Sequence, residues 1–280
     1  MPEPVTFALK LAYDGTKFFG TNPQPDRRTV HSEFLRAARK AGVRLANPAG
    51  GVPFASRTDR GVSALGNCVR ATVRQPTEAR QVVPALNARL DDAAVVGACA
   101  VPPSFHPRRA LARVYTYDLL ADDALDEGRM AQAARLLVGQ HDFSSFSRHD
   151  PATRARPGAY ESTIESVRVE RVGPTVAVTI RGSRFWWNMV RRIVPALEAH
   201  ARGQVELADI QRMLDGGPPA PPANRLAPPE PLVLEDVVYD DITFDSRAEW
   251  LRPKAPWVRA LRQEAVAAGS FARRLGERLV

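Results

Sequence analysis

The sequence predicts an α+β fold: sheets of strands, each covered by helices, built from two similar halves. Two periodicities predict it. Apolar residues alternate over runs such as 7–13, as in a half-buried strand, and recur every three to four residues over runs such as 126–138, as in an amphipathic helix. The composition, 44% hydrophobic and 25% charged in 280 residues, is ordinary for a soluble globular chain and allows one or two domains.

The first hundred residues predict strand, helix, loop, strand, helix and strand. Thr29 is a helix N-cap and Gly42 closes that helix, whereas Pro84 is expected to begin the next one. The expected elements are the strand 7–13, the helix after Thr29, the loop around 54–64, the strand 67–74, the helix 84–90 and the strand 95–101.

The second half repeats this rhythm. Its expected elements are strands 113–120, 163–170, 175–181 and 232–239, helices 126–138, 185–201 and 205–214, a polar loop 144–159 and a Pro-rich loop 218–231. We therefore predict an N-terminal subdomain (1–104), a C-terminal subdomain (105–248) and a basic amphipathic extension (249–280). Docking on the body, RNA binding and contact with an acidic membrane surface are open for the extension, and docking is the simplest.

Charge favours a polyanionic partner. The net charge is +8, and 35 of the 39 basic residues are arginines, which suit phosphate binding and base stacking. No apolar run reaches the roughly 18 residues of a membrane span, and the N-terminus lacks the features of a secretory signal. Two cysteines in apolar runs fit a reducing cytosol, so a cytoplasmic location is expected, and they cannot supply a four-cysteine zinc site.

Common catalytic motifs are missing from the sequence. It contains no GxxxxGK[ST] loop, GxSxG elbow or HExxH pair, and its five histidines lack ligand spacing. Nucleotide-driven, metal-dependent and serine-hydrolase chemistries therefore lose their usual support. The paired acids at 91–92 and 122–123 fall at element ends, where caps and turns explain them.

The loop 54–64, FASRTDRGVSA, is the candidate for chemistry. Asp59 stands between Arg57 and Arg60, which would keep its carboxylate ionised and able to act as a nucleophile or base. Taken locally, a surface Asp–Arg cluster worth about 0–1 kcal/mol explains the loop better. On the predicted helix 185–201, one of Arg191 and Arg192 must be buried or face a cleft, where it needs a carboxylate partner.

Several segments together resemble the TruA family of tRNA pseudouridine synthases. They occur in family order over residues 5–240: LAYDGTKFFG (11–20), SRTDRGVSA (56–64), FHPR (105–108), ARVYTY (112–117), DFSSF (142–146), MVRRIV (189–194) and PEPLVL (229–234). Thr21-Asn22 replaces the family's Trp-Gln, and Ser63 replaces its loop histidine. The tail 251–280 lies outside the resemblance.

The resemblance implies the pseudouridine synthase fold, with an active-site cleft between two subdomains and mainly antiparallel sheets. It implies that Asp59, Tyr115 and Arg191 are catalytic, and that Arg57, Thr58, Arg60 and Leu232 contact the substrate. It further implies isomerisation of uridine at positions 38–40 of the tRNA anticodon stem-loop with base flipping, by a homodimer that needs no metal or other cofactor. Trp186 and Trp187 are core or interface residues in this interpretation.

Three alternatives stay open. The chain could be a pseudouridine synthase for another tRNA position or RNA, or a non-catalytic RNA-binding protein on the same fold. A soluble enzyme for a small acidic substrate also fits the charge, although no site motif supports it.

Overall fold

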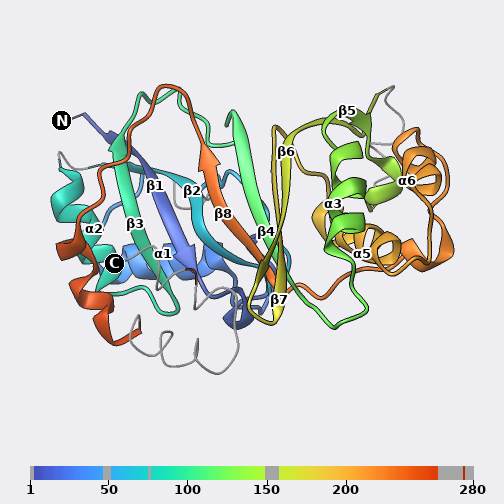
Figure 1. Ribbon diagram of the computed structural model, residues 1–280. Coiled ribbons are helices and arrows are strands. Elements are labelled where there is room, and N and C mark those ends of the chain that lie inside the picture. The colour runs from blue at the N-terminus through green and yellow to red at the C-terminus, as the bar shows by residue number, and fades with distance from the viewer. Residues whose placement is uncertain (1–2, 47–51, 75–76, 149–157, 258–273, 275–280) are drawn as a thin grey trace. The chain divides into compact units, whose positions relative to one another are not determined.

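Two units make up the chain in the computed structural model (Figure 1), which describes all residues except 1–2, 47–51, 75–76, 149–157, 258–273 and 275–280. The first unit combines Met1–Leu111 with Val233–Val280, and the second is Ala112–Leu232. Contacts thus group residues 233–248 with the first unit, whereas the sequence-based division assigns them to the second. The chain returns to its first unit through its last strand.

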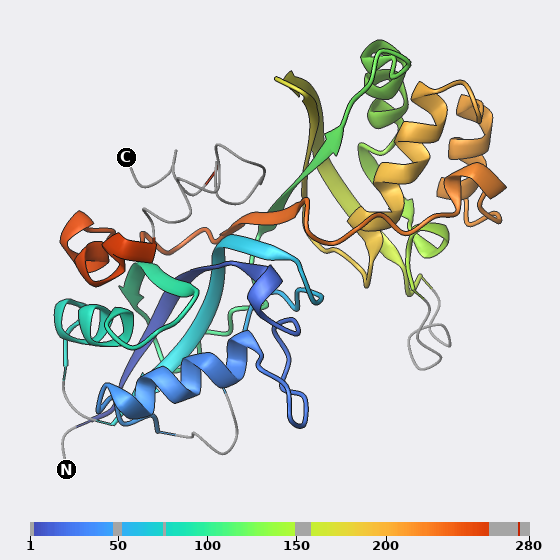
Figure 2. The same cartoon turned by 90° about the horizontal axis from the view of Figure 1, so that it is seen from below.

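The first unit is a four-stranded sheet in the order β3-β1-β2-β8, with α1 and α2 on the same side of it (Figure 2). β1 pairs antiparallel with both β2 and β3, and β8 runs parallel to β2. The elements are β1 (Val5–Tyr13), α1 (Val30–Lys40), β2 (Ser63–Val73), α2 (Ala79–Asn87), β3 (Ala93–Ala100), β8 (Leu232–Val238) and the short 3-10 turns Gly15–Lys17 and Ala248–Lys254.

Local signals explain α1. The Thr29 hydroxyl accepts the Ser32 N–H and the Ser32 hydroxyl accepts the Thr29 N–H, which closes a capping box. Phe34, with no exposed surface, packs into the core. After the C-cap, Gly42 has φ +71°, a conformation that favours glycine, so the predicted cap and stop of this helix are confirmed.

The second unit is an antiparallel sheet in the order β4-β7-β6-β5, with α3, α5 and α6 on one side (Figures 1 and 2). Its elements are β4 (Ala112–Leu120), α3 (Glu127–Leu136), β5 (Gly139–Asp142), β6 (Glu161–Val172), β7 (Thr175–Gly182), α5 (Met189–Ala201), α6 (Leu207–Leu214) and the 3-10 turns Ser144–Phe146 and Pro221–Ala223. Helices on one side of mainly antiparallel sheets confirm the predicted α+β class.

Three predicted boundaries were wrong. α2 begins at Ala79 under a capping box between Glu78 and Gln81, so Pro84 lies inside the helix rather than at its start. α5 begins at Met189 rather than 185, because Asn188 is left-handed (φ +65°) and interrupts the helical path. β2 begins at Ser63, which places the end of the candidate loop in a strand.

Only part of the basic extension belongs to the described residues. There, Arg274 forms an ion pair with Glu235 of β8 at 3.0 Å. Docking of the whole extension stays a prediction. The other basic residues of the extension beyond Trp257 fall outside the described part. In the part of the chain that the structure covers, no helix has the length and apolarity to cross a membrane.

Candidate active site

The loop before β2 is fixed through Thr58. The Thr58 Oγ1 lies 2.8 Å from the Tyr13 hydroxyl and 2.6 Å from the Thr21 Oγ1. Two backbone groups reinforce the contact: the Thr58 N–H donates to the Thr21 Oγ1 at 3.1 Å, and the Thr21 N–H donates to the Thr58 carbonyl at 3.1 Å. Residue 58 is therefore held on both its side chain and its main chain.

Asn67 in β2 extends this hydroxyl network. Its Nδ2 donates to the Tyr13 hydroxyl at 3.1 Å and to the Ser56 carbonyl at 3.0 Å, and its Oδ1 accepts the Ser56 N–H at 3.2 Å. Burial raises the pKa of Tyr13, against the lowering effect of its hydrogen bonds to Thr21, Thr58 and Asn67, so the phenol stays neutral at physiological pH. We name the set Tyr13, Thr21, Thr58 and Asn67 the hydroxyl network.

Two glycines allow the loop to press against the end of β1. A Cβ on Gly15 would lie 2.1 Å from the Val62 carbonyl oxygen, and one on Gly20 would lie 2.7 Å from the Thr58 carbonyl oxygen. The Gly61 N–H donates to the Gly15 carbonyl at 3.2 Å, and the Gly15 N–H donates to the Ser63 Oγ at 2.9 Å. The backbone of the loop therefore lies so close to Gly15 and Gly20 that a side chain at either position would clash with it.

The charged residues of the loop flank the anchored residue Thr58 in the sequence. Asp59 directly follows the buried Thr58 and is half-buried, and Arg57 and Arg60 are exposed. The Arg60 guanidinium stacks on the Phe19 ring at 4.4 Å, and Arg27 stacks on the same ring at 4.7 Å. A fixed backbone therefore presents a carboxylate with an arginine on each side.

Tyr115 lies in β4 of the second unit, where it is 8% exposed. It pairs with Ile180 of β7, and its ring packs edge-to-face against Phe185 with centroids 4.9 Å apart. The non-helical segment before α5 therefore supports this tyrosine. The same segment carries Trp186, which packs against Tyr160 at 5.4 Å, and Trp187, which is 50% exposed and lies under Arg148 at 4.0 Å.

Arg191 lies in the first turn of α5 and is half-buried. Its Nε donates to the Ala227 carbonyl at 2.8 Å, and its own carbonyl accepts the Ala227 N–H at 2.8 Å, which orients the guanidinium. Burial raises the pKa of neighbouring Tyr117 to about 12, against the lowering effect of the Arg191 charge. Its neighbour Arg192 donates to Asn224 instead, at 3.3 Å.

Leu232 opens β8 and is 5% exposed. Its N–H donates to the Pro229 carbonyl at 3.0 Å. The next residue, Val233, pairs with Ser63 of β2 in the first unit. The structure thus places Arg57, Thr58, Asp59 and Arg60 together on one loop of the first unit, and Tyr115, Arg191 and Leu232 in the second.

Among the described residues, no three His, Cys, Asp or Glu side chains are grouped to hold a metal ion.

The comparisons decide the family. The chain is 40% identical over 238 residues to tRNA pseudouridine synthase A of Pyrococcus abyssi, covering 85% of this chain and 86% of that one. It is 41% identical over 243 residues to the protein of the same name from Thermococcus kodakarensis, with the same coverage. This chain belongs to the tRNA pseudouridine synthase A family. The family model described as tRNA pseudouridine synthase matches residues 133–240, and the resemblance expected from the sequence is confirmed.

A solved structure gives a weaker likeness. A chain of a Cbf5-Nop10-Gar1 complex aligns with a TM-score of 0.36 and 10% identity, covering 67% of this chain and 45% of that chain. A similarity at that level carries no argument about this member of the tRNA pseudouridine synthase A family.

Sequence reasoning missed the hydroxyl network of this family member. In the sequence, Tyr13 is one of the alternating residues of a predicted strand, and Asn67 is only the first residue of the next predicted strand. The available signal was polarity: Asn67 is fully buried within a run that predicts a sheet core, and a buried amide requires hydrogen-bond partners.

Proposed function

We propose that this chain converts uridine to pseudouridine at positions 38–40 of the tRNA anticodon stem-loop, with Asp59 as the nucleophile or base. One observation carries the proposal: the hydroxyl network and the close contact of Gly15 with Val62 fix the backbone of the loop at Thr58, directly before Asp59. A pre-positioned carboxylate is what a nucleophilic or general-base step requires. The family supports the reaction type, as the relatives are named for it.

The reaction is an isomerisation whose atoms balance within the nucleotide. The N1–C1′ bond breaks, the base rotates, a C5–C1′ bond forms, and the proton lost from C5 is replaced by one gained at N1. Asp59 can serve in three ways: by attack on C1′, by attack on the base, or by removal of the C2′ proton. Each of them needs the carboxylate ionised, which a neighbouring cation favours.

Three residues of the second unit complete the proposed site. Arg191 would pair with the Asp59 carboxylate through its Nη groups, since its Nε is engaged by the Ala227 carbonyl. Tyr115, braced by Phe185, would stack on the flipped base and assist proton transfer at C5. Leu232, a buried apolar residue at the start of β8, would pack beneath the base.

Base flipping costs a few kcal/mol, which stacking and phosphate contacts must offset. Arg57, exposed and next to the anchored Thr58, would fill the space that the uridine vacates. Arg60, stacked on Phe19, would contact the RNA beside it. The net charge of +8 supports the phosphate contacts.

The function is tested by incubating the protein with a tRNA transcript labelled with tritium at uridine C5. We expect tritium release, and chemical mapping should place the new pseudouridines at positions 38–40. Release with pseudouridine at other positions would show a different specificity. If the protein bound tRNAs that carry uridines at these positions but released no tritium, the proposed isomerase activity would be contradicted. The alternative of a non-catalytic RNA-binding protein would then be favoured.

We further propose that the chain acts in the cytoplasm as a homodimer. The exposed Trp187, stacked under Arg148, is an aromatic surface of the kind enriched at protein interfaces. Light scattering on the purified protein should then give about twice the chain mass of 30.7 kDa. A mass near that of one chain at micromolar concentration would contradict the dimer.

A further inference from the structure

A basic groove of about 480 Å³ adjoins the candidate loop within the first unit. Three arginines and two histidines line it, together with an apolar floor that includes Phe54, and none of the described lining residues is an aspartate or glutamate. The cationic and imidazole side chains are Arg57, Arg70, Arg108, His31 and His106. A concave surface with positive charge and no lining carboxylate is suited to an anion.

The charges in the groove act on one another. Burial and the nearby positive charge of Arg57 both lower the pKa of Arg108. Burial lowers the pKa of His106 as well, and the charges of Arg70, Arg108 and Arg109 lower it further. These side chains therefore lie close enough for mutual repulsion, which a bound anion would relieve.

Backbone contacts orient the donors of the groove. The His106 Nδ1 accepts the Arg108 N–H at 3.2 Å, which assigns the ring proton to Nε2 and makes that atom a donor. The His31 Nε2 accepts the Val52 N–H at 3.2 Å in the same manner. The Arg70 Nη1 donates to the Phe105 carbonyl at 2.9 Å, which holds its guanidinium in place. Both imidazoles and the Arg70 guanidinium are thus held by backbone contacts.

The groove and the candidate loop share parts. Thr21 lines the groove and also bonds to Thr58, and Arg57 lines the groove two residues before Asp59. A two-residue separation is at most about 7 Å of chain. The groove therefore begins within two residues of Asp59, which is close enough for one RNA strand to reach both.

We propose that this groove binds a backbone phosphate of the RNA next to the flipped nucleotide. The inference rests on the proposed function, since it takes the RNA at the Asp59 loop as given. A phosphodiester fits better than a metal ion or a base edge, because the described lining residues offer guanidinium and imidazole groups and include no carboxylate. The contact is independent of base sequence and positions the strand.

The test measures binding of the full chain to an RNA hairpin that lacks uridine, over a range of KCl concentrations. Arg108→Gln removes an exposed groove charge, and Arg109→Gln removes an exposed charge from the adjacent residue, which does not line the groove. Loss of one phosphate contact should weaken binding by Arg108→Gln about tenfold and reduce the slope of log K against log salt by about 0.7. Arg109→Gln should change the affinity by no more than about twofold.

The two variants separate the outcomes. Phosphate binding in the groove would be contradicted if both variants weakened RNA binding equally, or if Arg108→Gln did not weaken it. It would also be contradicted if the unaltered protein failed to bind the hairpin at low salt. Arg70→Gln provides a second groove variant, checked by its melting temperature because it also loses the bond to Phe105. Since the hairpin has no uridine, the result is independent of isomerase activity. The experiment can therefore contradict phosphate binding in the groove without contradicting the isomerase function, and loss of the isomerase function would not contradict the groove.

Discussion

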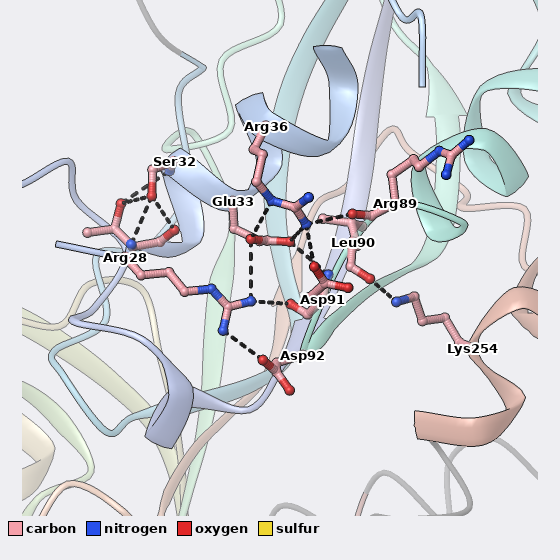
Figure 3. Close-up of polar contacts among 10 residues, drawn as sticks. Arg28, Ser32, Glu33, Arg36, Arg89, Leu90, Asp91, Asp92 and Lys254 are labelled. Atoms are coloured by element: carbon pink, nitrogen blue, oxygen red, sulfur yellow. Dashed lines mark hydrogen bonds and ion pairs between the residues drawn. The ribbon is translucent and has the colours of Figure 1, made fainter. Parts of the chain in front are cut away.

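Two polar clusters in the first unit each hold a loop in place, and they do so by different chemistry. The hydroxyl network fixes the Asp59 loop with neutral groups. The second cluster, Arg28, Glu33, Arg36, Asp91 and Asp92, ties α1 to the turn before β3 with charged groups (Figure 3). In its centre the buried Glu33 accepts the Asp91 N–H at 2.7 Å and the Arg36 Nε at 3.0 Å.

The difference lies in how each cluster responds to solution conditions. Burial opposes ionisation of Glu33, but hydrogen bonds from Arg36 and the Asp91 N–H, with the charges of Arg28 and Arg36, outweigh it, so its pKa is lowered. Tyr13, in contrast, has its pKa raised by burial and keeps its proton. We infer that the neutral network keeps the loop geometry constant over the pH and salt range in which an RNA enzyme works, and that the charged cluster contributes only to stability.

Gly15→Ala should have the largest effect, because its Cβ would lie 2.1 Å from the Val62 carbonyl and the loop would have to move. We expect turnover to fall by at least about 100-fold, the scale on which an ångström of misplacement acts. Tritium release under single-turnover conditions measures it. Gly42→Ala is the control for loss of a glycine away from the loop: Gly42 has φ +71° and nothing within 4 Å of its added Cβ, so this variant should keep its activity.

Tyr13→Phe should have an intermediate effect. It removes a buried hydroxyl that contacts Thr58 and Asn67, and the cost of leaving such groups unpaired is about 1–3 kcal/mol of unfolding free energy. Urea denaturation at pH 6 and pH 8 measures it, and the loss should be equal at the two pH values. A loss that depends on pH in this range would contradict the neutral character of the network.

Glu33→Gln should leave isomerase activity unchanged and lower the unfolding free energy at pH 7 by about 1–3 kcal/mol, because a buried carboxylate loses its charge while Arg28 and Arg36 retain Asp92 and Asp91 as partners. A lowered carboxyl pKa means that the stabilisation is complete above the ordinary value near 4.5 and is lost as the pH falls through the lower folded value. The unfolding free energies of the two proteins should therefore differ at pH 7 and converge at low pH. A constant difference down to pH 2.5 would contradict this account, as would a loss of isomerase activity at pH 7.

Local sequence signals predicted much of the fold. Alternation located the strands except β5, whose residues GQHD show no apolar alternation. Thr29 with Gly42 bounded α1 within a residue, because capping and left-handed turns depend on few neighbours. The interior position of Pro84 in α2 was not predicted, because proline lacks the N–H of a helical hydrogen bond and is favoured in the first turn of a helix. The start of α5 could not be predicted, since the left-handed Asn188 and the packing of Phe185 on Tyr115 are tertiary features.

The candidate site was predicted from the family resemblance rather than from local physics. Asp59 between two arginines has the same local pattern as a surface ion pair. What distinguishes it is the support beneath it, and Tyr13, Thr21 and Asn67 come from three separate segments. No local pattern relates residues that meet only after the sheet forms. Buried polar residues within apolar runs are the signal that could have located them.

The central claim is that the anchored loop presents Asp59 as the reacting carboxylate. The most direct measurement is single-turnover tritium release from C5-labelled tRNA by Asp59→Ala, compared with Asp123→Ala, which removes an exposed turn carboxylate of the second unit. We predict that Asp59→Ala melts at the same temperature and binds tRNA but releases tritium at least about 1000-fold more slowly, whereas Asp123→Ala matches the unaltered protein. Release by Asp59→Ala at the rate of the unaltered protein would contradict the claim.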